Sequence, residues 1–233
     1  MKIQAFHLTK VHSSGVKVLE DAYFSAPSGS FTVVIGESKT GKSTFLKMLG
    51  GEEKPTSGTL QVDHLDLYGF SPLEKQKWLS GVGMIFPDLQ LFPDKTVEEN
   101  ILLILHVKGV DADMASQKQA IGKLLFNAGL GSKVKAKPRD LSSGEQRMVM
   151  AMRAMIFKPR LLLADDPFQG LDEKAASALL RLLLELNKTG ATVMLSTQQT
   201  SFWEKAVKTA PEVTPQWIRL QDGKLLPQEE KVE

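Results

Sequence analysis

Short apolar runs along the chain predict strands, and longer segments whose apolar residues recur every three or four positions predict helices. Residues 217–226 favour a β-hairpin that turns at Asp222 and Gly223. The expected strands are 2–8, 16–24, 31–35, 59–62, 82–86, 160–165 and 192–197. The expected helices are 42–51, 72–80, 97–106, 115–128, 144–157 and 173–187. Strands that alternate with helices indicate an α/β fold with a mostly parallel sheet.

The composition is that of an ordinary globular protein. Of 233 residues, 42% are hydrophobic and 24% are charged, and the formal net charge of +2 gives no argument for nucleic acid or an anionic membrane as a partner. The absence of cysteine excludes disulfides, Cys-ligated zinc and thiol catalysis, and favours a reducing compartment. The longest apolar runs, such as 101–105, fall far short of the roughly 18–20 residues that span a bilayer, so work at a membrane would need another chain as anchor.

The strongest chemical signal is "GESKTGKST", residues 36–44, which follows a predicted strand and precedes a predicted helix. It fits the phosphate-binding P-loop pattern G-x-x-x-x-G-K-[ST], in which backbone N–H groups and the positive end of a helix surround a phosphate. Lys42 can reach the terminal phosphates, and the hydroxyl of Ser43 can ligate Mg²⁺. Lys39 stands mid-loop, where glycine is the expected residue. It is either a solvated lysine or a second phosphate ligand.

Two adjacent carboxylates, Asp165 and Asp166, end the apolar run 161–164. Successive side chains of a strand point to opposite faces, so the two acids are expected to have different roles. One can face the P-loop and hold Mg²⁺, and the other can face the water that attacks the terminal phosphate. The alternative is a solvent-exposed acidic turn before Pro167, which the presence of the P-loop disfavours.

Residues 141–155 predict a capped helix whose methionines lie at helical spacing. Ser142 to Gly144 form its N-terminus, and Glu145 lies in the first turn, where an acid is favourable. The residues alone leave two interpretations open: an amphipathic packing helix, or a second helix end that binds phosphate.

These motifs together resemble one family. The P-loop, "LSSGEQ" at 141–146, "LLLADDP" at 161–167 and "GLD" at 170–172 are similar in order and spacing to the nucleotide-binding domain of ABC-type ATPases, over essentially the whole chain. Residues 83–101 narrow the resemblance to the cell-division (FtsE-type) members, and less closely to lipoprotein-release and macrolide-export ATPases. The resemblance implies one domain, 1–233: an α/β P-loop NTPase core with a mostly parallel sheet, an N-terminal antiparallel β-subdomain and a helical subdomain inserted at about 88–158.

The resemblance also implies ATP and Mg²⁺ as cofactors, bound in a sandwich dimer between the P-loop of one chain and the helix end near residue 142 of the other. The P-loop residues expected to bind nucleotide are Gly36, Glu37, Ser38, Lys39, Thr40, Gly41, Lys42, Ser43 and Thr44. Ser43 and Asp165 would hold the metal, and His12 would stack on adenine or else be a surface residue. The second chain would contribute Ser142, Gly144 and Gln146.

Three positions depart from the family pattern that the resemblance implies. Pro87 replaces a glutamine after strand 82–86 and has no side-chain amide, while Gln90 lies three residues too late. Asp166 replaces a catalytic glutamate and is one methylene shorter, and a misplacement of about 1 Å can cost on the order of a hundredfold in rate. Gln198 replaces a histidine that would hold the terminal phosphate and the attacking water.

The expected catalytic residues are therefore Asp166, Gln198 and Lys42, in a protein that binds MgATP and dimerises but hydrolyses slowly. The resemblance implies an integral membrane permease-like partner, FtsX-like in the cell-division branch, and a cytoplasmic location, peripheral on the inner face of the cell membrane. The dimer can be homo- or heteromeric, and no nucleic acid is expected as a partner. The alternatives are a pseudo-ATPase binding module gated by nucleotide, and the degenerate half of a heterodimeric ABC transporter.

Overall fold

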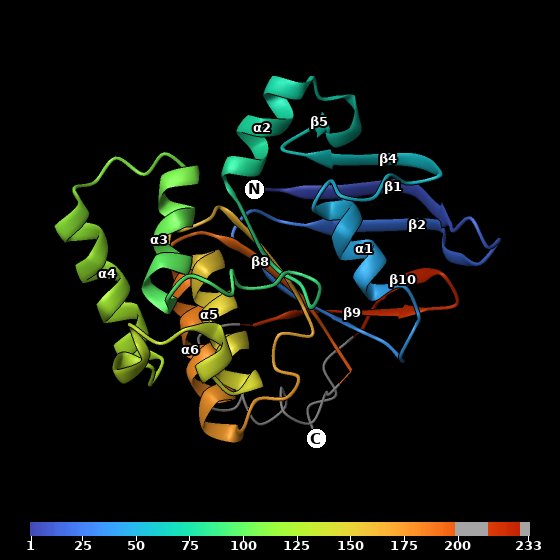
Figure 1. The fold of residues 1–233 in the computed structure, drawn as a ribbon. Helices are drawn as coiled ribbons and strands as arrows, with labels where there is room; N and C mark the ends of the chain where they lie inside the picture. The colour runs from blue at the N-terminus through green and yellow to red at the C-terminus, as the bar shows by residue number, and fades with distance from the viewer. Residues whose placement is uncertain (199–213, 229–233) are drawn as a thin grey trace.

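The computed structural model describes residues 1–198 and 214–228 and places two sheets side by side, with helices on either side of the larger one (Figure 1). The larger sheet has the strand order β10-β9-β3-β8-β7-β6. Neighbouring strands from β9 to β6 run parallel, and β10 is antiparallel to β9. Its strands are β3 (Phe31–Ile35), β6 (Val82–Ile85), β7 (Leu161–Asp165), β8 (Thr192–Thr197), β9 (Gln216–Gln221) and β10 (Lys224–Pro227).

The smaller sheet is antiparallel, with the strand order β2-β1-β4-β5. It consists of β1 (Ile3–Val11), β2 (Lys17–Ala26), β4 (Ser57–Val62) and β5 (Leu65–Asp66). Register shifts interrupt the pairing of β1 with both neighbours near His7, which has φ 51°. A left-handed residue at such a point bends the strand and increases its twist.

Six α-helices complete the described fold: α1 (Lys42–Leu49), α2 (Pro72–Ser80), α3 (Val97–Val107), α4 (Met114–Asn127), α5 (Ser143–Met155) and α6 (Glu173–Lys188). Three short 3-10 turns lie at Leu67–Gly69, Pro138–Asp140 and Gly131–Lys133. The helices α2, α3 and α5 each begin with a capping box, in which Ser71, Thr96 or Ser142 exchanges hydrogen bonds with a glutamate three residues later. The helices α3 and α4 form a lobe at one side of the larger sheet (Figure 1).

Alternation along the strands of the larger sheet separates two hydrophobic cores. On β7, Leu161 and Leu163 pack with α1 and the smaller sheet, whereas Leu162 and Ala164 pack with the helices α3 to α6. The same parity assigns Met194 of β8 to the α1 face. Continued by two residues, this parity also directs the side chains of Asp165 on β7 and Ser196 on β8 toward α1 and the P-loop that leads into it.

The structure confirms the predicted α/β fold, with every predicted strand and helix present and boundaries that differ by at most three residues. The predicted hairpin is formed by β9 and β10, and its turn residues Asp222 and Gly223 both have positive φ, 48° and 73°. Strand β5 has only two residues and was not predicted, since so short a run has no periodicity to detect. Within the described residues, no helix combines the length and the hydropathy that crossing a bilayer requires.

Candidate functional site

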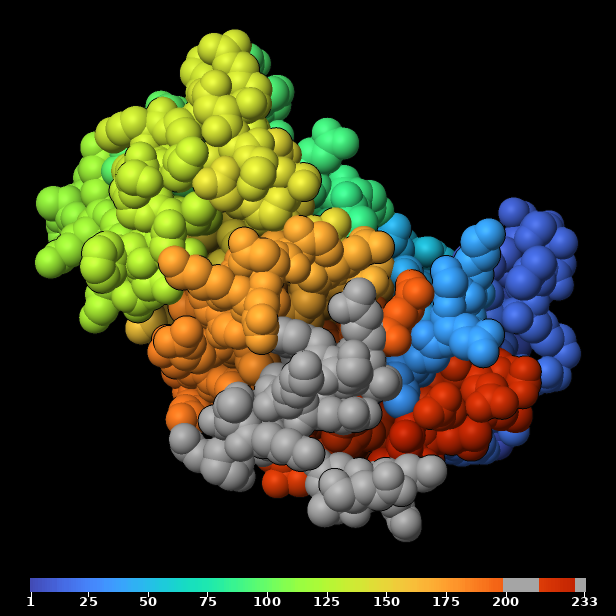
Figure 2. Space-filling view, turned by 90° about the horizontal axis from the view of Figure 1, so that it is seen from below, coloured from blue at the N-terminus to red at the C-terminus, as the bar shows by residue number. Residues whose placement is uncertain are grey.

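A pocket of about 530 Å³ lies at the carboxyl ends of the parallel strands, between α1 and the first turn of the chain after β1. Figure 2 shows this side of the molecule, with the P-loop region in light blue and the end of β8 in orange beside it. Carboxyl ends of parallel strands are where ligands bind in α/β sheets. The lining residues are His12, Ser14, Val16, Val18, Ser38, Lys39, Gly41, Lys42, Ser43, Thr44, Pro87, Asp165, Asp166, Gln169, Ser196 and Gln198.

Two glycines shape the P-loop because no side chain fits at their positions. A Cβ on Gly36 would lie 2.6 Å from the carbonyl oxygen of Leu220, and one on Gly41 would lie 2.8 Å from Cβ of Val18. Gly41 also has φ 103° and is the N-cap residue of α1. The loop thus turns tightly into a helix N-terminus, where free N–H groups and the helix dipole favour an anion.

Lys42, the first residue of α1, is buried with its ammonium curled back onto the loop. Its Nζ donates to the carbonyl oxygens of Gly36 at 2.8 Å and Glu37 at 2.5 Å. Burial lowers the pKa of Lys42, and the charges of Asp165 and Asp166 oppose that shift. The ammonium of Lys42 therefore lies at the centre of the loop, near Asp165 and Asp166 and at the edge of the open pocket.

Asp165 is the last residue of β7, and its side chain points to the α1 face, as the strand parity requires. It is 7% exposed, and its Oδ1 accepts a hydrogen bond of 2.5 Å from the hydroxyl of Ser196 on β8. Ser196 lies beside Asp165 in the parallel register. A buried carboxylate needs such a donor, and the hydroxyl of Ser196 supplies one to Asp165.

Asp166 does not continue the strand, so the two acids are not separated onto opposite faces as the alternation predicted. Its φ is 44°, a left-handed conformation that turns the chain at the end of β7, and it lines the same pocket as Asp165. Its N–H donates to both the carbonyl and the hydroxyl oxygen of Ser196, each at 3.1 Å. The turn brings the second acid back toward the P-loop.

The electrostatics of Asp166 differ from those of an exposed aspartate. Burial, and then the charge of Asp165, raise the pKa of Asp166, against the lowering effects of Lys42, Arg147 and a hydrogen bond from the side chain of Thr197. A carboxylate with a raised pKa is a stronger base than one in water, which suits a group that accepts a proton.

The other predicted residues of the near side also lie at this pocket or in its loop. The His12 ring is half-buried, and its Nε2 lies 3.3 Å from the hydroxyl of Thr44. Ser43 is exposed in the first turn of α1. Lys39 is exposed with φ 63°, a conformation that costs a residue with a Cβ about 1 kcal/mol or more. Thr40 closes the loop by donating its hydroxyl to the carbonyl oxygen of Glu37 at 3.0 Å.

Ser142, Gly144 and Gln146 are not among the lining residues of this pocket, as expected of residues predicted to reach a second chain. Ser142 caps α5, and its hydroxyl accepts from the N–H of Glu145 at 3.2 Å. The amide nitrogen of Gln146 donates to the carbonyl oxygens of Pro138, at 2.9 Å, and Leu141, at 3.3 Å. The role of Gln146 toward nucleotide stays a prediction, because its amide N–H groups already serve the chain's own loop.

The three positions that depart from the family pattern meet at one place. Pro87, Asp166 and Gln198 all line the pocket, with Pro87 and Gln198 exposed. Gln90 is not among the lining residues, and its carbonyl oxygen accepts from Arg153 of α5 at 2.8 Å. Proline contributes no side-chain hydrogen bond where the loop leaves β6.

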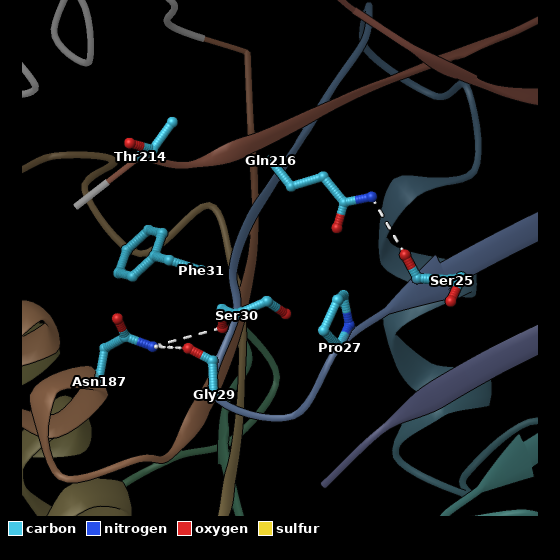
Figure 3. A pocket seen from close by; sticks show the side chains of 8 residues that line it. All are labelled: Ser25, Pro27, Gly29, Ser30, Phe31, Asn187, Thr214 and Gln216. Atoms are coloured by element: carbon cyan, nitrogen blue, oxygen red, sulfur yellow. Dashed lines mark hydrogen bonds between the residues drawn. The ribbon is translucent and has the colours of Figure 1, made fainter.

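A second hollow, of about 490 Å³, opens near the amino ends of β3 and β9 (Figure 3). Its described lining is uncharged, with amides from Asn187 and Gln216 that are directed to backbone oxygens of Gly29, Ser30 and Ser25. A triphosphate needs cationic or N–H donors, so the P-loop pocket is the better candidate for a nucleotide.

The residues at the P-loop pocket fit ATP and Mg²⁺ in chemistry. A lysine ammonium and a glycine-shaped helix N-terminus match phosphate. Among the described residues, no three His, Cys, Asp or Glu side chains gather as a metal site. Mg²⁺ is commonly held by one or two carboxylates together with phosphate oxygens, so Asp165 with the Ser43 hydroxyl is a sufficient protein contribution.

Comparison with known proteins identifies the class of protein that this fold and site define. The family description "ABC transporter" matches residues 19–169. The chain belongs to the ABC transporter ATPase family.

Particular relatives narrow the picture. The chain is 34% identical over 198 residues to the cell division ATP-binding protein FtsE of Mycobacterium tuberculosis, covering 84% of this chain and 85% of the relative. It is 34% identical over 191 residues to FtsE of Escherichia coli K12, covering 82% and 85%. The methionine import ATP-binding protein MetN of Bradyrhizobium diazoefficiens is 35% identical over 189 residues, covering 80% of this chain and 54% of that protein.

Solved structures agree with the fold. A dimeric ATP-binding cassette in a post-hydrolysis state, bound to ADP and Pi, superposes with a TM-score of 0.85 at 28% identity, covering 99% of both chains. A second dimeric structure, of a bacterial ABC transporter cassette, gives a TM-score of 0.86 at the same identity and coverage.

Some residues that shape the site were not found from the sequence. Ser196 was within a predicted strand, and parity alone could have directed it to the α1 face beside Asp165. Arg147 and Thr197, which influence Asp166, carry no motif. Only their proximity to Asp166 in the folded chain reveals them.

Proposed function

We propose that this chain is the ATP-binding subunit of an ABC-type membrane complex, and that it couples MgATP binding and slow hydrolysis to a permease-like membrane partner. Lys42 and the N-terminus of α1 bind the phosphates, and Ser43 and Asp165 hold the metal. When bound, Mg²⁺ would neutralise charge on the phosphate oxygens. Gly36 to Thr44 follow the P-loop pattern without a break, which supports this part of the proposal.

The observation that supports slow hydrolysis is that Pro87, Asp166 and Gln198 line one pocket. Asp166 orients the attacking water and accepts its proton. Its short side chain does so from a residue whose backbone is in a left-handed turn. Gln198 donates a hydrogen bond but carries no charge, and Pro87 donates none. The residues that position the attacking water are therefore weakened, whereas the residues that bind phosphate are intact.

The similarity to FtsE proteins supports a role in cell division, with an FtsX-like permease as the partner at the inner face of the cell membrane. A dimer, of two copies or with a related chain, brings Ser142, Gly144 and Gln146 of one subunit to ATP held by the other. The dimeric state of the two solved cassettes supports this arrangement.

The pocket also supports a second candidate, a nucleotide-gated binding module without useful hydrolysis, or the degenerate half of a heterodimer. The same three residues favour it, because they affect water rather than phosphate. It differs from the first proposal in one measurable quantity, the turnover number of the purified chain.

Calorimetry of ATP binding and steady-state phosphate release test both proposals on one preparation. We expect ATP to bind, Lys42→Ala to weaken binding by about 10- to 100-fold through loss of charged hydrogen bonds, and turnover to be slow. Asp166→Asn should abolish the turnover and leave binding within about twofold. If the chain binds ATP but shows no turnover that Asp166→Asn reduces, the binding module is favoured. Absence of ATP binding would refute both proposals.

A further inference from the structure

Arg147 lies in the second turn of α5, and its half-buried side chain reaches a different part of the chain. Its Nη1 donates to the backbone carbonyl oxygen of Asp166 at 3.2 Å, across 19 residues of sequence. A guanidinium carries several N–H donors in a planar fork, so one of them can serve this carbonyl oxygen.

The hydrogen bond from Arg147 is made to a residue whose backbone conformation is strained. Asp166 has φ 44°, and such a conformation persists only where the surroundings hold it. On its N-terminal side, the N–H of Asp166 donates to Ser196. On its C-terminal side, its carbonyl oxygen accepts from the N–H of Gln169 at 3.2 Å and from Arg147. Of these three residues, Arg147 alone lies on a helix outside the strand ends of the site.

The first turn of α5 also lies close to the other end of the same loop. Gly144 lies in the first turn of α5, and a Cβ there would be 3.4 Å from the carbonyl oxygen of Gly170 and 3.6 Å from Cδ2 of Leu171. The first two turns of α5 therefore lie close to both ends of the loop 166–171, with a hydrogen bond at the Asp166 end. A helix is stiff over two turns, so the position of the loop follows the position of α5.

We propose that Arg147 is a positioning residue for hydrolysis, which fixes the backbone of Asp166 to α5 and so aims the carboxylate into the P-loop pocket. This inference rests on the proposed function, in which Asp166 acts on the attacking water. Ser142 and Gly144 begin the same helix and are there assigned to ATP held by the second subunit. Arg147 thus links the acid of one site to the helix end that completes the other.

The test compares Arg147→Ala and Arg147→Lys with a matched control, Arg181→Ala, which removes an exposed arginine from α6. We expect Arg147→Ala to lower kcat for MgATP about tenfold with KM changed less than about twofold, because misplacing the acid leaves binding intact. Arg147→Lys keeps a cationic donor and should recover at least half of the wild-type kcat. Arg181→Ala should match wild type.

Hydrogen exchange on the nucleotide-free chain gives a second readout that needs no turnover. Arg147→Ala should speed amide exchange in 166–171 at least threefold, with exchange in β3 and α6 unchanged. If the wild type turns over ATP, a normal kcat in Arg147→Ala overturns the inference. A KM that rises by the same factor as kcat falls also overturns it. If the wild type does not turn over ATP, the proposed hydrolysis fails, and unchanged exchange in 166–171 then separately overturns the role of Arg147.

Discussion

The hydroxyl of Ser196 donates a 2.5 Å hydrogen bond to the carboxylate of Asp165, between neighbouring positions of the parallel strands β7 and β8. Both side chains point to the α1 face at the carboxyl end of the sheet. The same serine accepts the N–H of Asp166 through its hydroxyl and carbonyl oxygens. One small residue therefore fixes the orientation of one acid and the backbone of the other.

Ser196→Ala should lower the free energy of unfolding by about 1–3 kcal/mol, because Asp165 stays buried after losing its donor. MgATP affinity should fall more than affinity for metal-free ATP, since Asp165 is assigned to the metal. Urea unfolding and calorimetry with and without Mg²⁺ measure the two effects. Ser57→Ala removes an exposed hydroxyl from β4 and serves as the control. Wild-type stability in Ser196→Ala would contradict the role of the bond.

Lys39→Gly should raise the free energy of unfolding by about 0.5–1 kcal/mol, because glycine adopts φ 63° without steric cost. Thermal unfolding measures this gain, with Lys54→Gly in the loop before β4 as a control in which no gain is expected. The same variant distinguishes the two interpretations of Lys39. Unchanged ATP affinity identifies a solvated lysine, whereas affinity at least tenfold weaker identifies a second phosphate ligand.

The triple variant Pro87→Gln, Asp166→Glu and Gln198→His should raise kcat for MgATP at least about tenfold, because it restores the three groups that the family resemblance assigns to water. Glutamate is less suited than aspartate to φ 44°, so a small loss of stability should accompany the gain. Phosphate release at saturating MgATP measures the effect. Adding Lys42→Ala to the triple variant should abolish it. A triple variant that binds ATP normally without faster turnover would show that these positions do not limit the rate.

Asp88→Asn should lower stability at pH 7 by less than about 1 kcal/mol, since it breaks a partly exposed ion pair with Lys47, 2.6 Å away. The hydrogen bond from Lys47 lowers the pKa of Asp88, so the pair stabilises the folded state above the unfolded pKa of about 4. That stabilisation is lost as pH falls through the lower, folded pKa. The difference in melting temperature between wild type and Asp88→Asn should therefore shrink as the pH falls below the unfolded pKa, and vanish once the folded Asp88 is also protonated. Asp94→Asn, which removes an exposed carboxylate from the same loop, is the charge-matched control.

Much of the fold was predictable because the signals are local. The run at 161–164 is apolar and lies between charged residues, so a buried strand is the simple solution. The capping boxes at Ser71, Thr96 and Ser142 fix where three helices begin. The P-loop is equally local, since its glycines, lysine and serine act within nine consecutive residues.

The sequence by itself thus determined the elements, the P-loop and the family pattern, because backbone periodicity and turn chemistry act between near neighbours. Only the tertiary structure decided how Asp166 stands. Alternation placed it opposite Asp165, but its left-handed turn returns it to the same pocket. The groups that support this turn, Ser196 and Arg147, lie 30 and 19 residues away. Contacts at such separations depend on how strands align and helices pack, and no local pattern encodes them.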